Sequence, residues 1–175
     1  MESANNNIIS GQPIDGAADS KASSSADARL TFPKSERLRH KILVDSLFAK
    51  GKSVYEYPFR VVCRTLTDAE LAEAFSIGIP DRIAPLQVLI TIPKKKRRHA
   101  VDRVLMRRRI RDIWRRHRRP LRAVIEAAPE LRTMSVAIIY MSNENIPSAT
   151  LERKLTRLIG KLIARVDAES APDPV

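Results

Sequence analysis

The sequence has few of the residues from which disulfides, metal sites and phosphate-binding loops are built. Its 175 residues include one cysteine, Cys63, which excludes a disulfide within the chain and a metal site with several cysteine ligands. The five glycines are too scattered to form a glycine-rich phosphate-binding loop. The three histidines, His40, His99 and His117, lack the mutual spacing of metal ligands. We therefore expect no metal site and no catalytic residue able to cleave a bond unaided.

Long hydrophobic segments are also missing. The longest apolar runs are VLITI at 88–92 and VAIIYM at 136–141. Both are far shorter than the roughly 20 residues with which a helix crosses a bilayer. No apolar segment near the N-terminus resembles a signal peptide. These absences predict a cytoplasmic protein without a membrane partner.

Basic residues, by contrast, are concentrated in one stretch. Residues 94–119 read KKKRRHAVDRVLMRRRIRDIWRRHRR and contain fourteen lysines and arginines but two acids, Asp102 and Asp112. The rest of the chain holds 18 basic and 18 acidic residues, so the formal charge of +12 belongs to this stretch. Closely spaced arginines repel one another, and a polyanion relieves that repulsion while releasing its own counterions. The stretch therefore favours nucleic-acid binding over a solvated charged helix or a helix on a membrane surface.

The basic stretch also has the periodicity of a helix, from about Ala100 to His117. Apolar residues recur on one side at the spacing of a core-facing stripe, namely Met106, Ile110, Ile113 and Trp114. The other side carries Arg107, Arg108, Arg111 and Arg115. We expect a helix that docks by its stripe and presents arginines to a partner, with Trp114 either in the core or stacked on a base.

The start of the chain divides into a tail and a helix. Residues 1–30 are rich in Ser, Ala, Asn and Gly and predict a disordered tail, which places the folded domain at 31–168 and a loose tail at 169–175. A helix is expected from about Ser35, a suitable N-cap, to Lys50, with Gly51 ending it. Its apolar residues occupy more than one face. Val44 and Phe48, on one such face, either pack between two layers or border a groove.

The remaining segments predict an α+β protein. Three apolar runs have the composition of strands: Phe59–Leu66, Leu86–Ile92 and Val136–Met141. Short helices are compatible with residues 68–75 and 121–129, and a leucine stripe indicates a last helix at Ser148–Ala168. The basic helix then lies between the second and third strands, as the crossover of a βαβ unit.

Three local features resemble the protein component of bacterial ribonuclease P. They are FPKSERLRHK…LFAKGKS at 32–53, IPKKK at 92–96 and AVDRVLMRRRIRDIWR at 100–115, in the register of that family's Arg-Asn-Arg helix. The chain departs from the family at Val104 and Leu105, which stand where the Asn and second Arg are usual. The resemblance implies a small α–β sandwich with a mostly antiparallel sheet. It also implies a left-handed βαβ crossover, although the general rule favours the right hand.

The resemblance further implies a subunit that assists catalysis by an RNA. The ribonuclease P RNA would carry out the chemistry with Mg²⁺, which it would bind itself. The protein would bind that RNA and hold the single-stranded 5′ leader of precursor tRNA in a cleft between the first helix and the sheet, assisting endonucleolytic removal of the leader. Guanidinium groups suit the phosphates, and an aromatic ring suits a base.

We assign candidate residues to the two RNAs on this basis. Those expected to bind the leader are Phe48, Arg103, Arg107 and Arg111. Those expected to bind the ribonuclease P RNA are Lys95, Lys96 and Arg108. The alternative functions are a ribosomal or assembly RNA-binding protein and a basic DNA-binding protein, although we expect no DNA partner.

Overall fold

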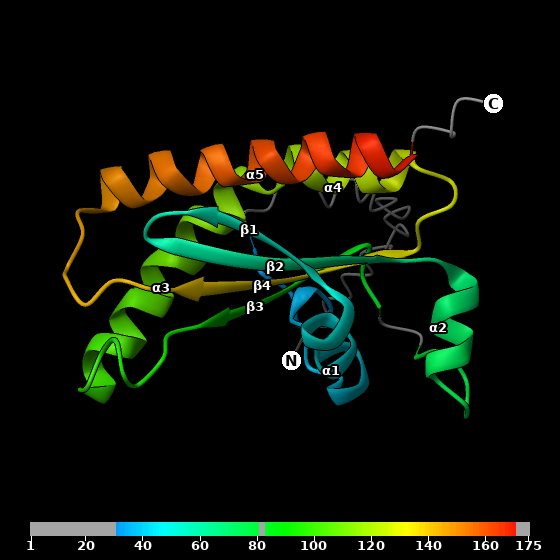
Figure 1. Cartoon of the computed structure of the whole chain (residues 1–175), viewed down its shortest axis with the longest axis horizontal. Coiled ribbons are helices and arrows are strands. Elements are labelled where there is room, and N and C mark those ends of the chain that lie inside the picture. The colour runs from blue at the N-terminus through cyan, green and yellow to red at the C-terminus, as the bar shows by residue number, and fades with distance from the viewer. Residues whose placement is uncertain (1–30, 81–82, 171–175) are drawn as a thin grey trace, which may run out of the picture.

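The structure is a computed structural model that describes residues 31–80 and 83–170. One four-stranded sheet lies between two layers of helices (Figure 1). In chain order the elements are the 3₁₀ helix η2 (Lys34–Glu36), α1 (Lys41–Lys50), β1 (Lys52–Glu56), β2 (Phe59–Leu66), α2 (Asp68–Ala74), β3 (Leu86–Thr91), α3 (Ala100–His117), α4 (Arg119–Ala127), β4 (Thr133–Tyr140) and α5 (Ser148–Ser170). The mixed α+β fold agrees with the prediction from the sequence.

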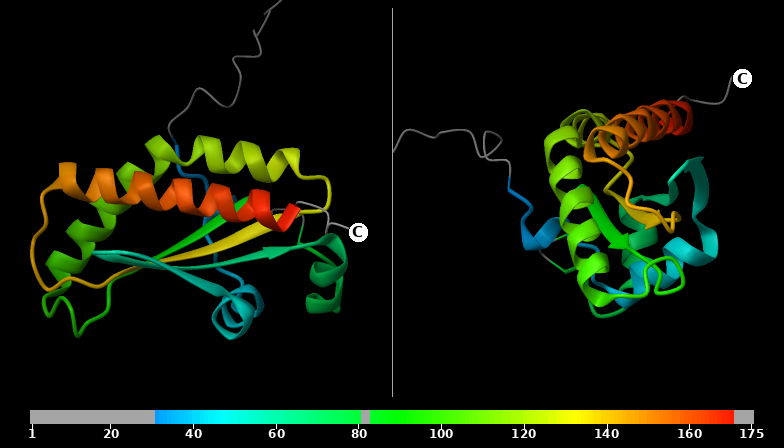
Figure 2. Two further views of the ribbon diagram at one scale, coloured as in Figure 1. Left: turned by 45° about the horizontal axis from the view of Figure 1, so that its top comes forward. Right: turned by 90° about the vertical axis from the view of Figure 1, so that its left-hand side faces the viewer.

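The sheet is mostly antiparallel, with strand order β1-β2-β4-β3. Strands β1 and β2 form a hairpin, and β2 pairs antiparallel with β4. Strand β3 pairs parallel with β4, and the chain between them passes through α3 and α4. In the right-hand view of Figure 2 these two strands run toward the viewer, with β3 to the left of β4 and α4 and α5 above. The crossover is therefore left-handed, against the general preference.

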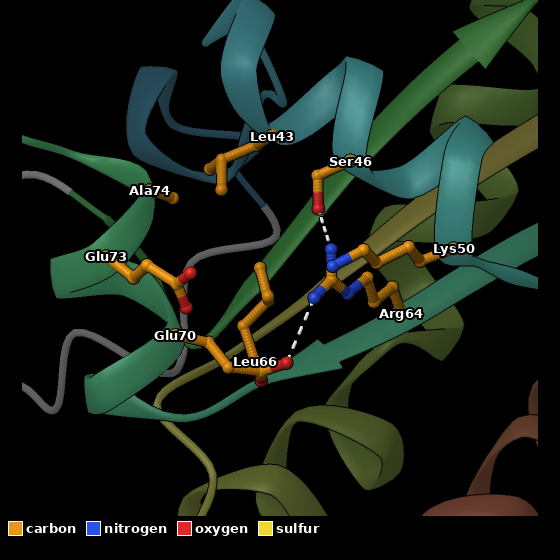
Figure 3. Close-up of a pocket in the computed structure, with 8 residues that line it drawn as sticks. All are labelled: Leu43, Ser46, Lys50, Arg64, Leu66, Glu70, Glu73 and Ala74. Carbon is orange, nitrogen blue, oxygen red and sulfur yellow. Dashed lines mark hydrogen bonds and ion pairs between the residues drawn. The ribbon is translucent and has the colours of Figure 1, made fainter.

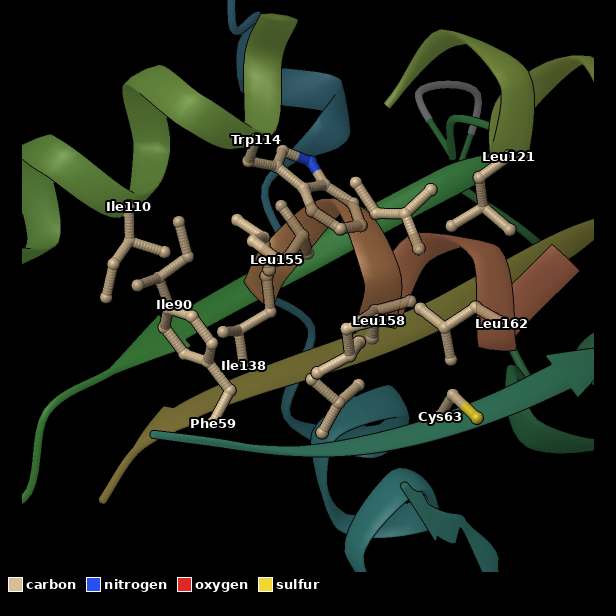
Figure 4. Close-up of a cluster of buried hydrophobic side chains, with 14 of the residues drawn as sticks. Phe59, Cys63, Ile90, Ile110, Trp114, Leu121, Ile138, Leu155, Leu158 and Leu162 are labelled. Atoms are coloured by element: carbon tan, nitrogen blue, oxygen red, sulfur yellow. The ribbon is translucent and has the colours of Figure 1, made fainter. Parts of the chain in front are cut away.

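The main core fills the space between the sheet and helices α3, α4 and α5 (Figure 4). The stripe of α5 is completely buried and consists of Leu151, Leu155, Leu158, Leu162 and Val166. The stripe of α3 is buried as predicted, and Trp114 is fully enclosed. Trp114 is thus a core residue and is not accessible to a base.

A second cluster of buried residues lies on the opposite face of the sheet, beneath α1. Leu43 and Leu47 of α1 pack there with Val62 of β2 and Ala137 of β4. Gly51 directly follows α1, and a Cβ atom at this position would lie 2.1 Å from the Leu47 carbonyl oxygen and 2.7 Å from Val62 Cγ1. Glycine is therefore required here because the chain leaves α1 close to the helix's own Leu47 carbonyl and to Val62 of β2.

The ends of α2, β3, α4 and β4 differ from the predicted bounds by one to three residues, and three differences are larger or concern the predicted tail. Helix α1 begins at Lys41, not near Ser35, because Arg37 forms a parallel β-bridge with Val88 and the Leu38 amide donates to the Val88 carbonyl at 3.1 Å. Strand β1 was not predicted. Helix α5 continues to Ser170, two residues into the predicted tail, and the other predicted tail residues lie outside the described part of the chain.

Candidate nucleic-acid interface

The four arginines predicted to form the basic face of α3 lie in two different environments. Arg107, Arg108 and Arg111, in its middle, form no ion pair within the described residues. The Nε atoms of Arg107 and Arg111 are buried and have no hydrogen-bond partner there. Arg115, one turn further on, is instead paired with Asp112 at 2.6 Å. Among the described residues, the predicted basic face is therefore unpaired in the middle of the helix, and Asp112 partly neutralises it at its end.

Carboxylates neutralise the side of α3 that faces α5. Arg116 pairs with Asp112 at 3.2 Å and with Glu152 of α5 at 2.7 Å. His117 contacts the same Glu152 carboxylate at 2.5 Å, and these contacts lower the pKa of Glu152. These basic residues of α3 thus hold two helices together and are less available to an external polyanion.

The segment before α1 adds a further cation to the middle of α3. The Arg37 guanidinium lies 5.6 Å from the centroid of the Phe32 ring, and the Arg111 guanidinium lies 5.7 Å from the same centroid. A hollow of about 320 Å³ between these groups is also lined by Arg108 and, at one end, by the ion pair of Asp112 with Arg115. We call Arg37, Arg107, Arg108 and Arg111 the arginine cluster.

The arginine cluster is electrostatically unfavourable in the free protein. Burial lowers the pKa of Arg111, and the positive charges of Arg37, Arg107 and Arg108 lower it further. A pKa lowered by like charges means that the fold holds cations together against their repulsion. Phosphate groups would relieve this repulsion, whereas carboxylates of the protein do not.

A buried ion pair fixes the segment that carries Phe32 and Arg37. Glu36 is 3% exposed, and its carboxylate lies 2.9 Å from the Nε atom of Arg118, at the junction of α3 and α4. Arg118 also donates to the Thr31 carbonyl at 2.8 Å. The position of the arginine cluster therefore depends on a contact between residues 82 apart in the chain.

The other predicted basic residues lie at or near the loop that joins β3 to α3. Arg103 donates to the carbonyl oxygens of Arg97 at 3.0 Å and Arg98 at 2.7 Å, so its guanidinium holds this loop to the helix. Lys95 and Lys96 lie in the turn that follows Pro93. Lys96 borders a separate hollow with Tyr55 and Tyr57. The predicted residues thus form two groups, the arginine cluster and this loop, while Phe48 lies apart on α1.

Part of the sheet is uncovered on the α1 side. The register aligns Thr91, Ile139, Arg60 and Tyr55 across the four strands. Because side chains alternate along a strand, Arg60 shares the face of Val62, which packs under α1. Thr91, Ile139 and Arg60 are half-buried, and Tyr55 is exposed. We call this row of four residues the open sheet face.

Helix α1 presents Val44 and Phe48 on one side. Val44 is half-buried and packs against the second cluster, as Ile139 of the open sheet face also does. Phe48, one turn after Val44, is 50% exposed. The sequence predicted that Val44 and Phe48 either pack between two layers or border a groove. The structure shows packing for Val44, whereas Phe48 is accessible to a ligand.

A pocket on the α2 side of α1 has a different chemistry (Figure 3). It encloses about 250 Å³ between α1, β2 and α2. Arg64 in its wall donates to Ser46 and, at 2.9 Å, to Glu70, so the guanidinium is already paired. Glu70 and Glu73 contribute carboxylates that repel phosphate. This pocket is therefore a poor site for an RNA backbone.

Several residues of the candidate interface were missed in the sequence. Arg37 and Phe32 join the arginine cluster from a segment that was assigned to a helix, although FPKSERLRHK is itself rich in basic residues. Tyr55 was missed because β1 was not predicted. Arg60 lies in the predicted strand β2, but the sequence did not show that its face of the sheet is uncovered. The alternation of Tyr55 and Tyr57 directly before Pro58 could have indicated a strand that ends in exposed aromatic residues.

Comparisons with known proteins agree on one family. The Ribonuclease P family model matches residues 32–163. The ribonuclease P protein component of Porphyromonas gingivalis strain W83 is 27% identical over 137 residues, which cover 78% of this chain and 90% of that protein. A mutant RNase P protein of Staphylococcus aureus, described as defective in mRNA degradation activity, has a similar fold. Its TM-score is 0.51 at 17% identity, over 75% of this chain and 90% of that one.

Two further features of the described residues bear on the kind of protein this is. None of their helices combines the length and apolar character needed to cross a bilayer. Within the same residues, no group of three or more His, Cys, Asp or Glu side chains is arranged to hold a metal ion. With the family match spanning most of the sequence, the chain belongs to the ribonuclease P protein components, the protein subunits of an endoribonuclease ribonucleoprotein that processes tRNA.

Proposed function

We propose that this protein binds the ribonuclease P RNA and the 5′ leader of precursor tRNA through two connected surfaces. The observation that carries the proposal is the arginine cluster, in which like charges are held together without a carboxylate partner among the described residues. RNA phosphates supply the missing negative charge, and their condensed counterions are released on binding.

The leader, in this proposal, crosses the open sheet face beside Phe48. Arg60 offers a cation to the backbone, while Ile139 and the exposed Phe48 ring offer apolar contacts to unpaired bases. Single-stranded RNA is held in this way by stacking combined with basic residues, without the need to read a sequence. Arg107 and Arg111 of the arginine cluster guide the same strand at the β3 edge.

The ribonuclease P RNA contacts the outward side of α3 and the loop before it. Arg108 is exposed on that side, and Lys95 has no ion-pair partner among the residues that the structure describes. Arg103 is the exception among the predicted leader residues. Because its guanidinium is used on loop carbonyls, we propose that it shapes the loop and that backbone amides and lysines of the loop meet the RNA.

Magnesium enters this proposal through the RNA. The chemistry of leader removal would be supplied by Mg²⁺ held mainly by RNA phosphates, and the protein would lower the repulsion between the two RNAs by placing cations between them. The proposed place of action is the cytoplasm.

The experiment that tests the function is reconstitution. The full chain is added to the matching ribonuclease P RNA, and leader removal from precursor tRNA is followed as Mg²⁺ is lowered. We expect the protein to restore cleavage at Mg²⁺ concentrations at which the RNA alone is inactive. Unchanged cleavage at every Mg²⁺ concentration would contradict the proposal. A preference for duplex DNA over single-stranded RNA at fixed salt would contradict it as well.

A further inference from the structure

Two tyrosines are exposed at the turn between β1 and β2. Tyr55 is 60% exposed and Tyr57 is 65% exposed, and neither contributes to the main core or the second cluster. Exposed aromatic rings are few in this chain, in which 5% of the residues are Phe, Trp or Tyr. Two of them within three residues therefore suggest a surface with a ligand.

Both rings are held in place by neighbouring side chains. The hydroxyl of Tyr57 donates to Ser142 Oγ at 3.1 Å, which ties the ring to the chain after β4. The guanidinium of Arg60 lies 5.5 Å from the centroid of the Tyr55 ring and also donates to Ser53 at 3.3 Å. Fixed rings lose little entropy when a base stacks on them, so this arrangement favours binding.

A hollow of about 360 Å³ lies between the two rings. Pro58, Phe59 and Met141 provide its apolar lining, and Lys96 reaches it from the loop that follows β3. None of the described residues that line it carries a carboxylate. Aromatic rings beside a lysine match the two halves of a nucleotide, because the base stacks on the ring and the phosphate pairs with the ammonium.

The hollow is continuous with the surface proposed for the leader. Tyr55 is the direct cross-strand neighbour of Arg60 and forms the outer end of the open sheet face. A strand of RNA that crosses Thr91, Ile139 and Arg60 therefore reaches Tyr55 next. Continuity with this row favours the leader as the occupant over the ribonuclease P RNA.

We propose that Tyr55, Tyr57 and Lys96 hold one unpaired nucleotide of the precursor-tRNA leader, with its base against a tyrosine ring and its phosphate near Lys96. Because Lys96 borders this hollow, the proposal moves it from the ribonuclease P RNA, to which the sequence assigned it, to the leader. This site rests on the function proposed above and extends it to a position that the arginine cluster and Phe48 do not reach. According to this proposal, the affinity for precursor tRNA depends on whether a base is present at one leader position. It does not depend on which base that is.

The test compares variants in the reconstituted ribonucleoprotein. The variant Tyr55→Ala/Tyr57→Ala removes both rings, and Tyr55→Phe/Tyr57→Phe keeps them. Ile77→Ala, at an exposed residue far from this site in the sequence, serves as a matched surface control. The affinity for precursor tRNA is measured with leaders shortened one nucleotide at a time and with leaders that carry a single abasic nucleotide. Thermal unfolding shows that each variant is folded.

We expect the alanine variant to bind long-leader precursor tRNA roughly tenfold more weakly, the order of loss for one stacked base. Ile77→Ala should bind like the wild-type protein. The phenylalanine variant should keep most of the affinity, because both rings remain although the hydrogen bond from Tyr57 to Ser142 is lost. An abasic nucleotide at one leader position should weaken the wild-type complex by a similar factor and add no further loss in the alanine variant, because the two changes remove one contact.

Three results would overturn the site. One is equal affinity of the alanine and wild-type proteins for every leader length. Another is a loss that persists with mature tRNA, which would place the rings on the ribonuclease P RNA. The third is additive losses from the abasic leader and the alanine variant. A wild-type protein that fails to assist cleavage would instead contradict the function itself.

Discussion

Glu36 belongs to the most deeply buried ion pair among the described residues. Its buried carboxylate lies against Arg118, whose side chain is 9% exposed. A buried charge that loses its partner is left without solvation, which typically costs about 3–5 kcal/mol. We therefore expect Glu36→Ala to lower the free energy of unfolding by about this amount, and chemical denaturation would measure it.

The matched control is Glu126→Ala. Glu126 also accepts from an arginine, Arg122, at 2.8 Å, but its side chain is 44% exposed. Exposed pairs contribute about 0–1 kcal/mol, so this variant should unfold nearly like the wild type. Equal losses in the two variants would show that burial of Glu36 has no special consequence.

Glu56 makes the stability of the folded protein depend on pH in the acidic range. Contacts with Lys154 and Lys161 of α5 lower its pKa from 4.5 to about 2. A carboxyl group with a lowered pKa stabilises the fold above its unfolded-state pKa and loses this contribution as the pH falls through the folded-state pKa. The stability difference between wild type and Glu56→Gln should therefore shrink between pH 4.5 and about 2.

Thermal unfolding across this pH range would measure the difference. Lys154→Met removes one of the two ammonium groups that lower the pKa of Glu56. In this variant the stability contributed by Glu56 should therefore depend less on pH over the same range. A difference between wild type and Glu56→Gln that stays constant down to pH 2 would show that the ammonium groups do not act on this carboxyl.

At the level of elements, periodicity predicted the long helices and the buried strands well. Helix α3 and strand β2 have the predicted bounds, because a buried stripe on α3 and a β-branched run in β2 leave few alternatives. The start of α1 was predicted too early. Its signal, Pro33 and Ser35, belongs to a 3₁₀ turn, and the pairing of Arg37 with Val88 is a tertiary contact that local sequence does not encode.

Strand β1 was missed because its side chains are mostly exposed. Its sequence KSVYE has one aliphatic residue, Val54, and the strand exists because β2 supplies its hydrogen-bond partners. The candidate site was affected in the same way. Arg107, Arg108 and Arg111 were found from helical spacing. Arg37 and Tyr55, by contrast, belong to sites that are assembled from segments far apart in the chain.

Helix α3 divides its basic residues into two functional groups, which can be separated by salt. Replacing Arg107 and Arg111 by Ala should flatten the dependence of log affinity on log salt by roughly 0.7 per lost contact with single-stranded RNA. The control is Arg116→Ala on the same helix, because Arg116 is already paired with Asp112 and Glu152. Binding titrations at several salt concentrations measure the slopes. Equal slopes for the double variant and the wild type would contradict phosphate contact.

For the molecule as a whole, the distribution of charge lowers the stability of the folded protein. The net charge is +12, and the pKa of Arg111 is lowered by burial and further by the positive charges of the other arginines of the cluster. The remaining ion pairs that join elements are partly exposed, apart from that of Glu36. Exposed pairs contribute little and repulsion within a cluster is screened by salt, so repulsion should dominate the response of the free protein to ionic strength.

The free protein should therefore become more stable as salt is added, while its affinity for RNA falls. We expect the melting temperature to rise between about 50 and 200 mM salt, the range over which RNA affinity drops steeply. Arg111→Gln removes one cation from the cluster, so it should melt at a higher temperature than the wild type at low salt and gain less from added salt. Thermal unfolding of both proteins across a salt series measures this. A melting temperature that falls with salt would mean that attractive ion pairs outweigh the cluster, and the arginines would then need no external anion.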